Sequence, residues 1–345
     1  MLLQVWGNAL AIDLGTATTR VWSRNGHAMV REASAVAYSH RRPRVVAVGW
    51  KARDLAQREA SNVDVVEPIR RGSVAEFNAA VAMLRAFVSQ ALERRPLLSP
   101  TAIVSAPAEA TGVEYRALRD AVRAAGLSRV HVIAKSLAAS VGAGLPMDHS
   151  QSVLVLDLGA GLTEIGVVSS GMLTVARSLP WGGVDLDEAL RRYLRRAAGI
   201  QISRAAAEDI KLRVGTVDPA QAKDSIDLSG MITPGVQAKV AAPDLAVALA
   251  ESLEPVIEEV RWVIEQLAPR QRAEVEHNGA ILSGGGALLK GLPELLSAHL
   301  DIRMTVAEDP LSATILGLSA IASDMKRLWM DGEHMVSVSL SPSIF

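Results

Sequence analysis

Short continuous apolar runs alternate along this chain with segments in which apolar residues recur every three to four positions. The first pattern predicts strands and the second predicts helices. Short unbroken apolar runs at 10–12 and 153–156 predict buried strands, and a second β-prone run follows each of them. Apolar residues at three- to four-residue spacing predict a helix that opens at a Ser73 capping box and continues to about Arg94.

The alternation of strands and helices occurs twice along the chain. For the first half the pattern predicts a capped helix from Thr111 to Gly126, a strand over 130–133 and a small-residue helix over 137–143. For the second half it predicts a hairpin over 153–175, helices over 185–198 and 208–214, a β-prone stretch over 225–241, a helix over 244–267 kinked at Pro255, a strand over 280–282 and a helix over 313–328. Two similar halves of this kind predict a duplicated, two-lobed α/β fold.

Composition narrows the class of protein. The 345 residues are 49% hydrophobic, which is ample for two buried cores, and the net charge of −1 provides no field that would attract nucleic acid. The chain has no cysteine, which excludes disulfides, thiolate catalysis and cysteine-ligated zinc. No apolar run approaches the ~18 residues of a membrane span, and the N-terminus lacks a signal-peptide pattern. We therefore expect a cytoplasmic protein with no nucleic-acid partner.

One short phrase occurs twice, in the same strand context each time. Asp-Leu-Gly-Thr-Ala-Thr-Thr begins at Asp13, and Asp-Leu-Gly-Ala-Gly-Leu-Thr begins at Asp157. Small residues at a hairpin tip let backbone N–H groups turn toward an anion, so two such tips can bind the phosphates of one nucleotide. The two aspartates can orient the waters of one Mg²⁺. The candidate residues are Asp13, Gly15, Thr16, Ala17, Thr18, Asp157, Gly159, Ala160, Gly161 and Leu162.

A third motif, Ser283-Gly284-Gly285-Gly286, follows a predicted strand. Without side chains at this turn, a base or ribose can lie directly on the backbone. A tight turn that packs a helix on a sheet is the alternative interpretation. The candidate adenosine-binding residues are Gly284, Gly285, Gly286, Ala287 and Leu288.

Together these motifs resemble the actin–Hsp70–sugar kinase superfamily, and within it the bacterial actins of the MreB/Mbl family. The resemblance covers nearly the whole chain and is carried by residues 11–19, 156–164 and 282–292. It implies an actin-like, ribonuclease H-like α/β fold whose two lobes enclose a cleft for ATP and Mg²⁺. Glu208 and Lys211 are similar to the family's Ala-Glu-x-x-Lys helix, whose side chains approach ribose and base; an ordinary exposed helix face is the alternative.

The resemblance also implies boundaries for the lobes. We expect lobe I to span 1–145, with a core of 1–30, 70–145 and 313–330 and a small inserted subdomain at 31–69. We expect lobe II to span 146–312, with a core of 146–180 and 242–312 and a small inserted subdomain at 181–241. Residues 331–345 are expected to form a loose C-terminal tail.

The chain departs from the family at two places. The family's Ile-Glu-Glu-Pro segment, whose glutamate helps to activate the attacking water, is replaced by Ile133-Ala134-Lys135-Ser136. Neither an alanine nor a protonated lysine can accept that water's proton. The second phosphate loop has Ala160 and Leu162 where the family has glycine and threonine. No catalytic residue is assigned, and we expect nucleotide hydrolysis to be slow or absent.

The resemblance implies partners as well. MreB-like proteins polymerise on the inner face of the cell membrane, organise cell-wall synthesis and cell shape, and work with membrane proteins such as MreC and RodZ. Leu97 and Leu98 stand where such proteins carry a lipid-inserting apolar pair, and Leu2, Leu3 and Trp6 are further membrane candidates. Packing of these side chains under a loop or over a sheet edge is the alternative. The sequence leaves open whether a sister MreB co-assembles, whether ATP or GTP is preferred, and the polarity and strand number of the filament.

Two rival functions remain at this point. A small-molecule kinase of the same superfamily would need a carboxylate base, which the Ala134-Lys135 segment does not supply. A non-polymerising, nucleotide-binding adaptor would remain in the supernatant under conditions that pellet filaments.

Overall fold

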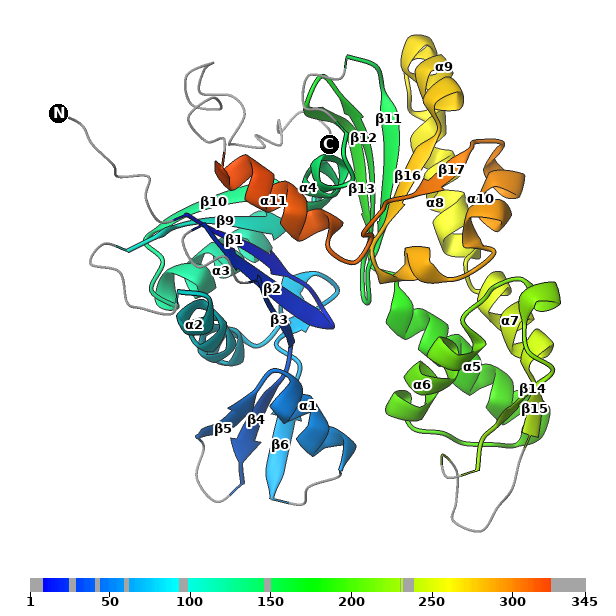
Figure 1. The fold of residues 1–345 in the computed structure, drawn as a ribbon, viewed down its shortest axis with the longest axis horizontal. Coiled ribbons are helices and arrows are strands. Elements are labelled where there is room, and N and C mark those ends of the chain that lie inside the picture. The colour runs from blue at the N-terminus through cyan, green and yellow to red at the C-terminus, as the bar shows by residue number, and fades with distance from the viewer. Residues whose placement is uncertain are drawn as a thin grey trace. The chain divides into compact units, whose positions relative to one another are not determined.

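The computed structural model describes residues 9–24, 29–40, 44–58, 62–92, 99–145, 150–229, 231 and 239–323. The chain divides into two compact units, whose elements are labelled in Figure 1. Unit 1 comprises residues 1–149, 171–173 and 312–345, and unit 2 comprises residues 150–170 and 174–311.

Unit 1 contains a five-stranded sheet in the order β10-β9-β1-β2-β3. Its strands are β1 (Ala9–Leu14), β2 (Thr18–Ser23), β3 (Met29–Ala33), β9 (Thr101–Ala106) and β10 (Arg129–Ala134). β1 pairs antiparallel with β2 and parallel with β9, and all of its residues are buried. A continuous apolar run such as β1 forms a strand of this kind because both faces of the sheet are covered.

Helices cover both faces of this sheet (Figure 1). On one face, α2 (Phe77–Leu92) and α3 (Gly112–Ala124) share a core with Leu10, Ile12 and Leu14. The other pair is α4 (Lys135–Gly142) and α11 (Ala313–Ser323), which pack on each other. Of these two, α11 contacts β1. Because side chains alternate along a strand, Ala11 and Asp13 face away from the α2–α3 core.

A smaller sheet, in the order β5-β4-β6, is inserted between β3 and α2. Its elements are β4 (Val36–Ser39), β5 (Val45–Val48), α1 (Trp50–Gln57) and β6 (Val63–Val66), and a short hairpin of β7 (Ile69–Arg70) and β8 (Ser73–Val74) follows them. The core of this part is built from alanines: Ala33, Ala35, Ala37 and Ala52.

Of the two predicted helix N-caps, the one at Thr111 is confirmed and the one at Ser73 is wrong. The Thr111 hydroxyl accepts from the Glu114 N–H over 3.3 Å, and Glu114 accepts in return from the Thr111 N–H over 2.9 Å. Ser73 instead belongs to strand β8, and its hydroxyl donates to Glu114 over 2.5 Å. α2 therefore begins only at Phe77.

Unit 2 contains a second five-stranded sheet, in the order β13-β12-β11-β16-β17. Its strands are β11 (Val153–Leu158), β12 (Thr163–Ser169), β13 (Met172–Leu179), β16 (Ala280–Ser283) and β17 (Met304–Val306). The central strand β11 pairs antiparallel with β12 and parallel with β16, as β1 does with β2 and β9. The duplicated α/β topology predicted from the sequence is confirmed.

The remaining elements of unit 2 build its core against this sheet. They are α5 (Gly183–Ala198), α6 (Arg204–Val214), η1 (Pro219–Gln221), β14 (Ser225–Asp227), β15 (Lys239–Ala241), α7 (Ala242–Glu251), α8 (Glu254–Glu265), α9 (Pro269–Asn278), the 3₁₀ turn η2 (Gly285–Leu288) and α10 (Leu292–Leu300).

The single kinked helix expected over 244–267 is two helices. α7 ends at Glu251, and α8 begins at Glu254 with Pro255 in its first turn. Proline is tolerated there because the first N–H groups of a helix have no acceptor within it. The same preference explains α9, which the sequence analysis did not predict and which begins at Pro269.

Candidate functional site

The two Asp-Leu-Gly segments form the same turn in their separate units. Each lies at the tip of a hairpin, between β1 and β2 in unit 1 and between β11 and β12 in unit 2. An added Cβ on Gly15 would lie 2.5 Å from the Thr18 carbonyl oxygen, and one on Gly159 would lie 2.7 Å from the Leu162 carbonyl oxygen. Both turns therefore need glycine for the same steric reason.

A serine on the neighbouring parallel strand donates to each aspartate. Ser105 Oγ lies 3.0 Å from Asp13 Oδ1, and Ser283 Oγ lies 2.9 Å from Asp157 Oδ1. All four side chains are buried. The sequence analysis did not identify these serines; their signal is the parallel register, in which Asp157 pairs with Ser283 and Ile12 with Val104, the residue before Ser105.

The residue that faces each aspartate across the hairpin differs between the units. Arg20 pairs with Asp13, whereas Glu164 pairs with Asp157. Directly paired residues of an antiparallel ladder share one face of the sheet. Asp13 is thus opposite a cation, and Asp157 is opposite a second acid.

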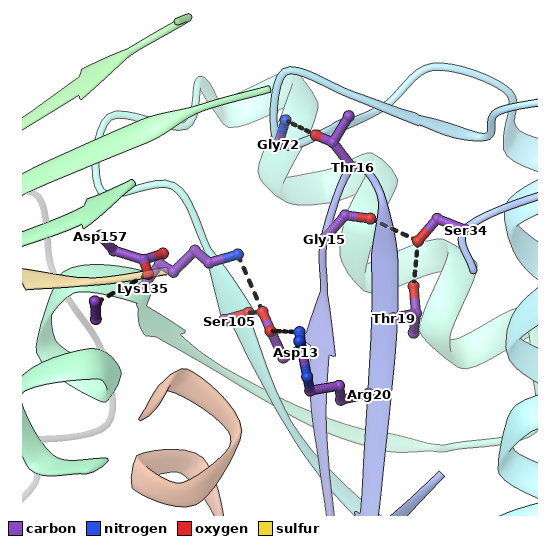
Figure 2. A network of polar contacts seen from close by, with 11 residues as sticks. Asp13, Gly15, Thr16, Thr19, Arg20, Ser34, Gly72, Ser105, Lys135 and Asp157 are labelled. Carbon is purple, nitrogen blue, oxygen red and sulfur yellow. Dashed lines mark hydrogen bonds and ion pairs between the residues drawn. The ribbon is translucent and has the colours of Figure 1, made fainter. Parts of the chain in front are cut away.

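Asp13 also has a second cation beside it, which Figure 2 shows. Lys135 Nζ lies 3.1 Å from Asp13 Oδ1, and Arg20 Nη1 lies 3.5 Å from Asp13 Oδ2. Burial acts to raise the pKa of Asp13, but the charges of Lys135 and Arg20 and the hydrogen bonds from Lys135 and Ser105 outweigh it. The pKa of Asp13 is therefore held below its ordinary value, and the carboxyl stays ionised.

The first hairpin tip is held by polar contacts from the residue that follows β3 (Figure 2). Ser34 Oγ donates to the Gly15 carbonyl over 2.6 Å and lies 2.8 Å from Thr19 Oγ1. The Gly72 N–H donates to Thr16 Oγ1 over 3.3 Å. Gly15, Thr16, Ala17 and Thr18 are all partly exposed, so this tip remains accessible while these contacts hold it.

The second tip is held by the start of α5. The Gly183 and Val184 N–H groups donate to the carbonyls of Gly159 and Ala160 over 3.0 and 2.8 Å. Gly159 and Ala160 are partly exposed, whereas Gly161 and Leu162 are buried. Of the predicted second-loop residues, the first two are therefore the accessible ones.

The glycine-rich motif packs against the end of β11. An added Cβ on Gly284, whose φ is +80°, would lie 2.4 Å from the Leu158 carbonyl oxygen. Gly285 is exposed and Ala287 is buried, while Leu288 is 54% exposed. The motif thus combines an accessible backbone with an outward apolar side chain, and in unit 2 it lies beside the strand that carries Asp157.

Lys211 connects two helices of unit 2. Its Nζ lies 2.7 Å from Asp187 Oδ1 and donates to the Gly183 carbonyl over 3.0 Å. Burial raises the pKa of Asp187 against the opposing charge of Lys211, and partly exposed Glu208 raises it further. Lys211 therefore joins α6 to the helix start that holds the second tip. No sequence motif marks Asp187 as a functional residue.

The two aspartates differ in how well they fit magnesium. Both oxygens of Asp13 already face cations, which leaves it unsuited to accepting hydrogen bonds from the waters of a metal ion. Asp157 accepts from Ser283, and its cross-strand neighbour is Glu164. Within the described residues, no three or more His, Asp or Glu side chains form a group that could hold a metal by themselves.

The predicted membrane residues Leu2, Leu3, Trp6, Leu97 and Leu98 lie outside the described residues, as does the 331–345 tail. Among the helices that the structure does describe, none is long and apolar enough to cross a membrane.

Comparison with known proteins gives the family. The sequence profile of the MreB/Mbl protein family matches residues 7–330. The chain belongs to the MreB/Mbl family. The cell shape-determining protein MreB of Escherichia coli is 34% identical to this chain over 323 residues, which are 91% of this chain and 92% of the E. coli protein.

Two solved structures share the fold of this chain. MreB5 of Spiroplasma citri, in a crystal structure bound to AMPPNP, is 25% identical with a TM-score of 0.87, covering 94% of this chain and 99% of its own. A MamK chain from a double helical filament is 22% identical with a TM-score of 0.77, covering 92% of this chain and 99% of its own. The fold of this MreB/Mbl family member is therefore actin-like, as the resemblance implied.

Proposed function

We propose that this chain is a nucleotide-binding cytoskeletal protein that polymerises into filaments. The observation that carries the proposal is the duplicated hairpin tip, with its aspartate, its serine partner and its sterically required glycine in each unit. A family relative with this fold, MreB5 of S. citri, binds AMPPNP, which supports ATP as the ligand.

The phosphates bind to the two hairpin tips. Backbone N–H groups at Gly15–Thr18 and at Ala160–Leu162 are the proposed donors, since small residues at these tips allow close approach of an anion. The Gly159 N–H donates within its own turn, to the Leu162 carbonyl over 2.9 Å. The firm anchoring of the first tip by Ser34 lowers the ordering cost of binding. At the second tip Gly159 and Ala160 are the accessible residues, and Ala160 is the proposed N–H donor of the two.

The adenosine lies on the glycine-rich motif. Gly284, Gly285 and Gly286 offer backbone without side chains, and Ala287 and Leu288 offer apolar surface for the base. Glu208 is proposed to contact the ribose or base. Lys211 supports this region by fixing the start of α5, in addition to any contact with nucleotide.

Hydrolysis is proposed to be slow or absent. Ala134 is buried at the end of β10, and Lys135, the next residue, is directed to Asp13. Neither can accept a proton from an attacking water, and loss of a positioned base typically costs ~10²–10⁴ in rate. Mg²⁺ accompanying the nucleotide would be oriented by Asp157, whose carboxylate is the better suited of the two.

Filaments form by repetition of a head-to-tail contact, since such an interface does not close on itself. MamK, which shares the fold, assembles as a double helical filament. We further propose that filaments lie on the inner face of the cell membrane through Leu2, Leu3, Trp6, Leu97 and Leu98, with MreC- and RodZ-like partners, and act in cell shape. Each inserted leucine contributes ~1.5–3 kcal/mol at most, so binding requires the many copies of a filament.

Sedimentation and electron microscopy with ATP, ADP and no nucleotide test this function. Filaments that depend on nucleotide, and that Asp157→Asn weakens while Asp209→Asn does not, would support it. Asp209 is a suitable control because it makes only a surface ion pair with Arg213. Nucleotide binding without any pelleting would favour the adaptor, and rapid phosphate transfer to a small molecule would favour the kinase.

Liposome flotation tests the membrane contact. The Leu97→Ser, Leu98→Ser double variant should float less than the wild-type filament. Undiminished flotation would exclude this pair as the lipid contact.

A further inference from the structure

We propose that the Lys135 ammonium serves as a built-in cation at the first phosphate-binding tip, so that nucleotide binding at this tip depends less on Mg²⁺ than it would without Lys135. This inference rests on the proposed nucleotide-binding function and deepens it.

The position of Lys135 is defined by three groups around one carboxylate. Lys135 Nζ and Ser105 Oγ share Asp13 Oδ1 at 3.1 and 3.0 Å, while Arg20 lies 3.5 Å from the other oxygen. Each of these side chains is largely buried, so solvent screens the pairs weakly. The arrangement is shown in Figure 2.

The local structure keeps the Lys135 ammonium beside Asp13. It is the first residue of α4, directly after the N-cap Ala134. A positive charge at a helix N-terminus is opposed by the helix dipole, and the ionised Asp13 carboxylate compensates for it. The ammonium is therefore fixed at Asp13 rather than extended into solvent.

The charge balance of this tip differs from that of its counterpart in unit 2. Two cations face one carboxylate around Asp13, so this group carries net positive charge. Around Asp157 the cross-strand neighbour is Glu164, another acid. A carboxylate beside a polyphosphate repels it, and a divalent cation ordinarily offsets that repulsion. At the first tip, Lys135 and Arg20 already do so.

The consequence is a reduced requirement for metal at the first tip. Phosphate oxygens that approach residues Gly15–Thr18 meet a group with net positive charge, whereas without Lys135 they would meet a carboxylate balanced by Arg20 alone. Removing Mg²⁺ should then cost the wild-type chain less affinity than it costs a chain without Lys135. Removing Lys135 should restore a dependence on Mg²⁺, because Asp13 would then be balanced by Arg20 alone.

Equilibrium titration with a fluorescent ADP, in Mg²⁺ and in EDTA, tests the inference. For the wild-type chain we expect the ratio of the Kd in EDTA to the Kd in Mg²⁺ to report the second tip alone. For Lys135→Ala we expect this ratio to be about tenfold larger, a difference of about 1.4 kcal/mol. Lys135→Arg should behave as the wild type, and so should Lys51→Ala, which removes an exposed lysine of the same unit.

A double variant separates charge from damage to the fold. In Asp13→Asn, Lys135→Ala the repelling carboxylate is gone as well, so the ratio of the two Kd values should return to the wild-type value. Thermal unfolding of each variant without nucleotide shows that the compared proteins are folded.

The outcomes distinguish this inference from the function beneath it. A Lys135→Ala chain whose ratio of the two Kd values equals that of the wild type overturns the role of Lys135 and leaves nucleotide binding intact. A wild-type chain that binds no adenine or guanine nucleotide in either buffer overturns the proposed function, and this inference with it.

Discussion

Lys135 holds its ammonium 3.1 Å from Oδ1 of Asp13, the carboxylate at the end of the central strand of unit 1. The substitution that removes a candidate base between β10 and α4 thus places a cation beside Asp13. One substitution accounts for two expected properties, slow hydrolysis and an altered charge at the phosphate-binding tip.

The ion pair predicts a pH-dependent loss of stability in Lys135→Ala. The pKa of Asp13 is lower in the folded chain than its ordinary value of 3.8, so its ionisation stabilises the fold above that pH, and this contribution is lost as the pH falls through the folded pKa. Without Lys135 we expect a loss of roughly 1–3 kcal/mol near pH 7 and a progressively smaller loss as the pH falls below 3.8. Urea unfolding across this range measures the loss at each pH; an equal loss at every pH would contradict the prediction.

Glu274 predicts a second pH effect, in unit 2. It accepts from the Ser152 N–H and hydroxyl over 2.8 Å each, and with Arg270 these bonds lower its pKa from 4.5 to about 2. Its contribution to stability should be complete above the higher value and disappear as the pH falls toward the lower one. Glu274→Gln should make the free energy of unfolding vary less with pH between these two pKa values. Glu276→Gln, which loses only a surface ion pair with Arg272, should leave that pH dependence unchanged. Identical acid profiles for the two variants would refute this role of Glu274.

The contact between α4 and α11 predicts a steric effect in unit 1. An added Cβ on Gly142 would lie 1.7 Å from the Ala313 carbonyl oxygen, with no flexible side chain to move aside. Gly142→Ala should therefore destabilise the chain by roughly 1–3 kcal/mol or more. Gly112→Ala is the matched control, since nothing lies within 4 Å of its added Cβ, and it should change the melting temperature little. A Gly142→Ala variant as stable as this control would contradict the close contact between α4 and α11.

The Asp187–Lys211 pair separates structural from ligand-binding roles. Removing the lysine leaves a buried carboxylate without its closest cation, which typically costs about 3–5 kcal/mol. Lys211→Ala should lose stability of this order in the absence of nucleotide, and Asp187→Asn, Lys211→Met should recover part of it. If Lys211→Ala is fully stable without nucleotide but binds it weakly, the lysine acts on the ligand alone.

Hydrophobic period and turn residues predicted the duplicated sheets well, because continuous apolar runs such as 153–156 can be buried only in a covered sheet. Local signals failed where tertiary contacts compete with them. Ser73 has a capping-box sequence, yet its hydroxyl bonds to Glu114, forty-one residues away. Pro255 was interpreted as a kink because its position in the first turn of a new helix depends on where α7 ends.

The site was predictable to a similar degree. Repetition of Asp-Leu-Gly identified both tips, since the motif and its steric need for glycine are local. The partners Ser105, Ser283 and Arg20 depend on strand register, which no single segment encodes. The substitution at Lys135 was visible as a lost base, but its contact with Asp13 follows only from the packing of α4 against the sheet.

Cryo-electron microscopy of the protein assembled with AMPPNP tests the central claim most directly. The account predicts filaments in which the phosphate density contacts the backbone of Gly15–Thr18 and Gly159–Ala160, with the base on Gly284–Leu288. Filaments or single particles whose nucleotide density lies away from both hairpin tips would contradict it.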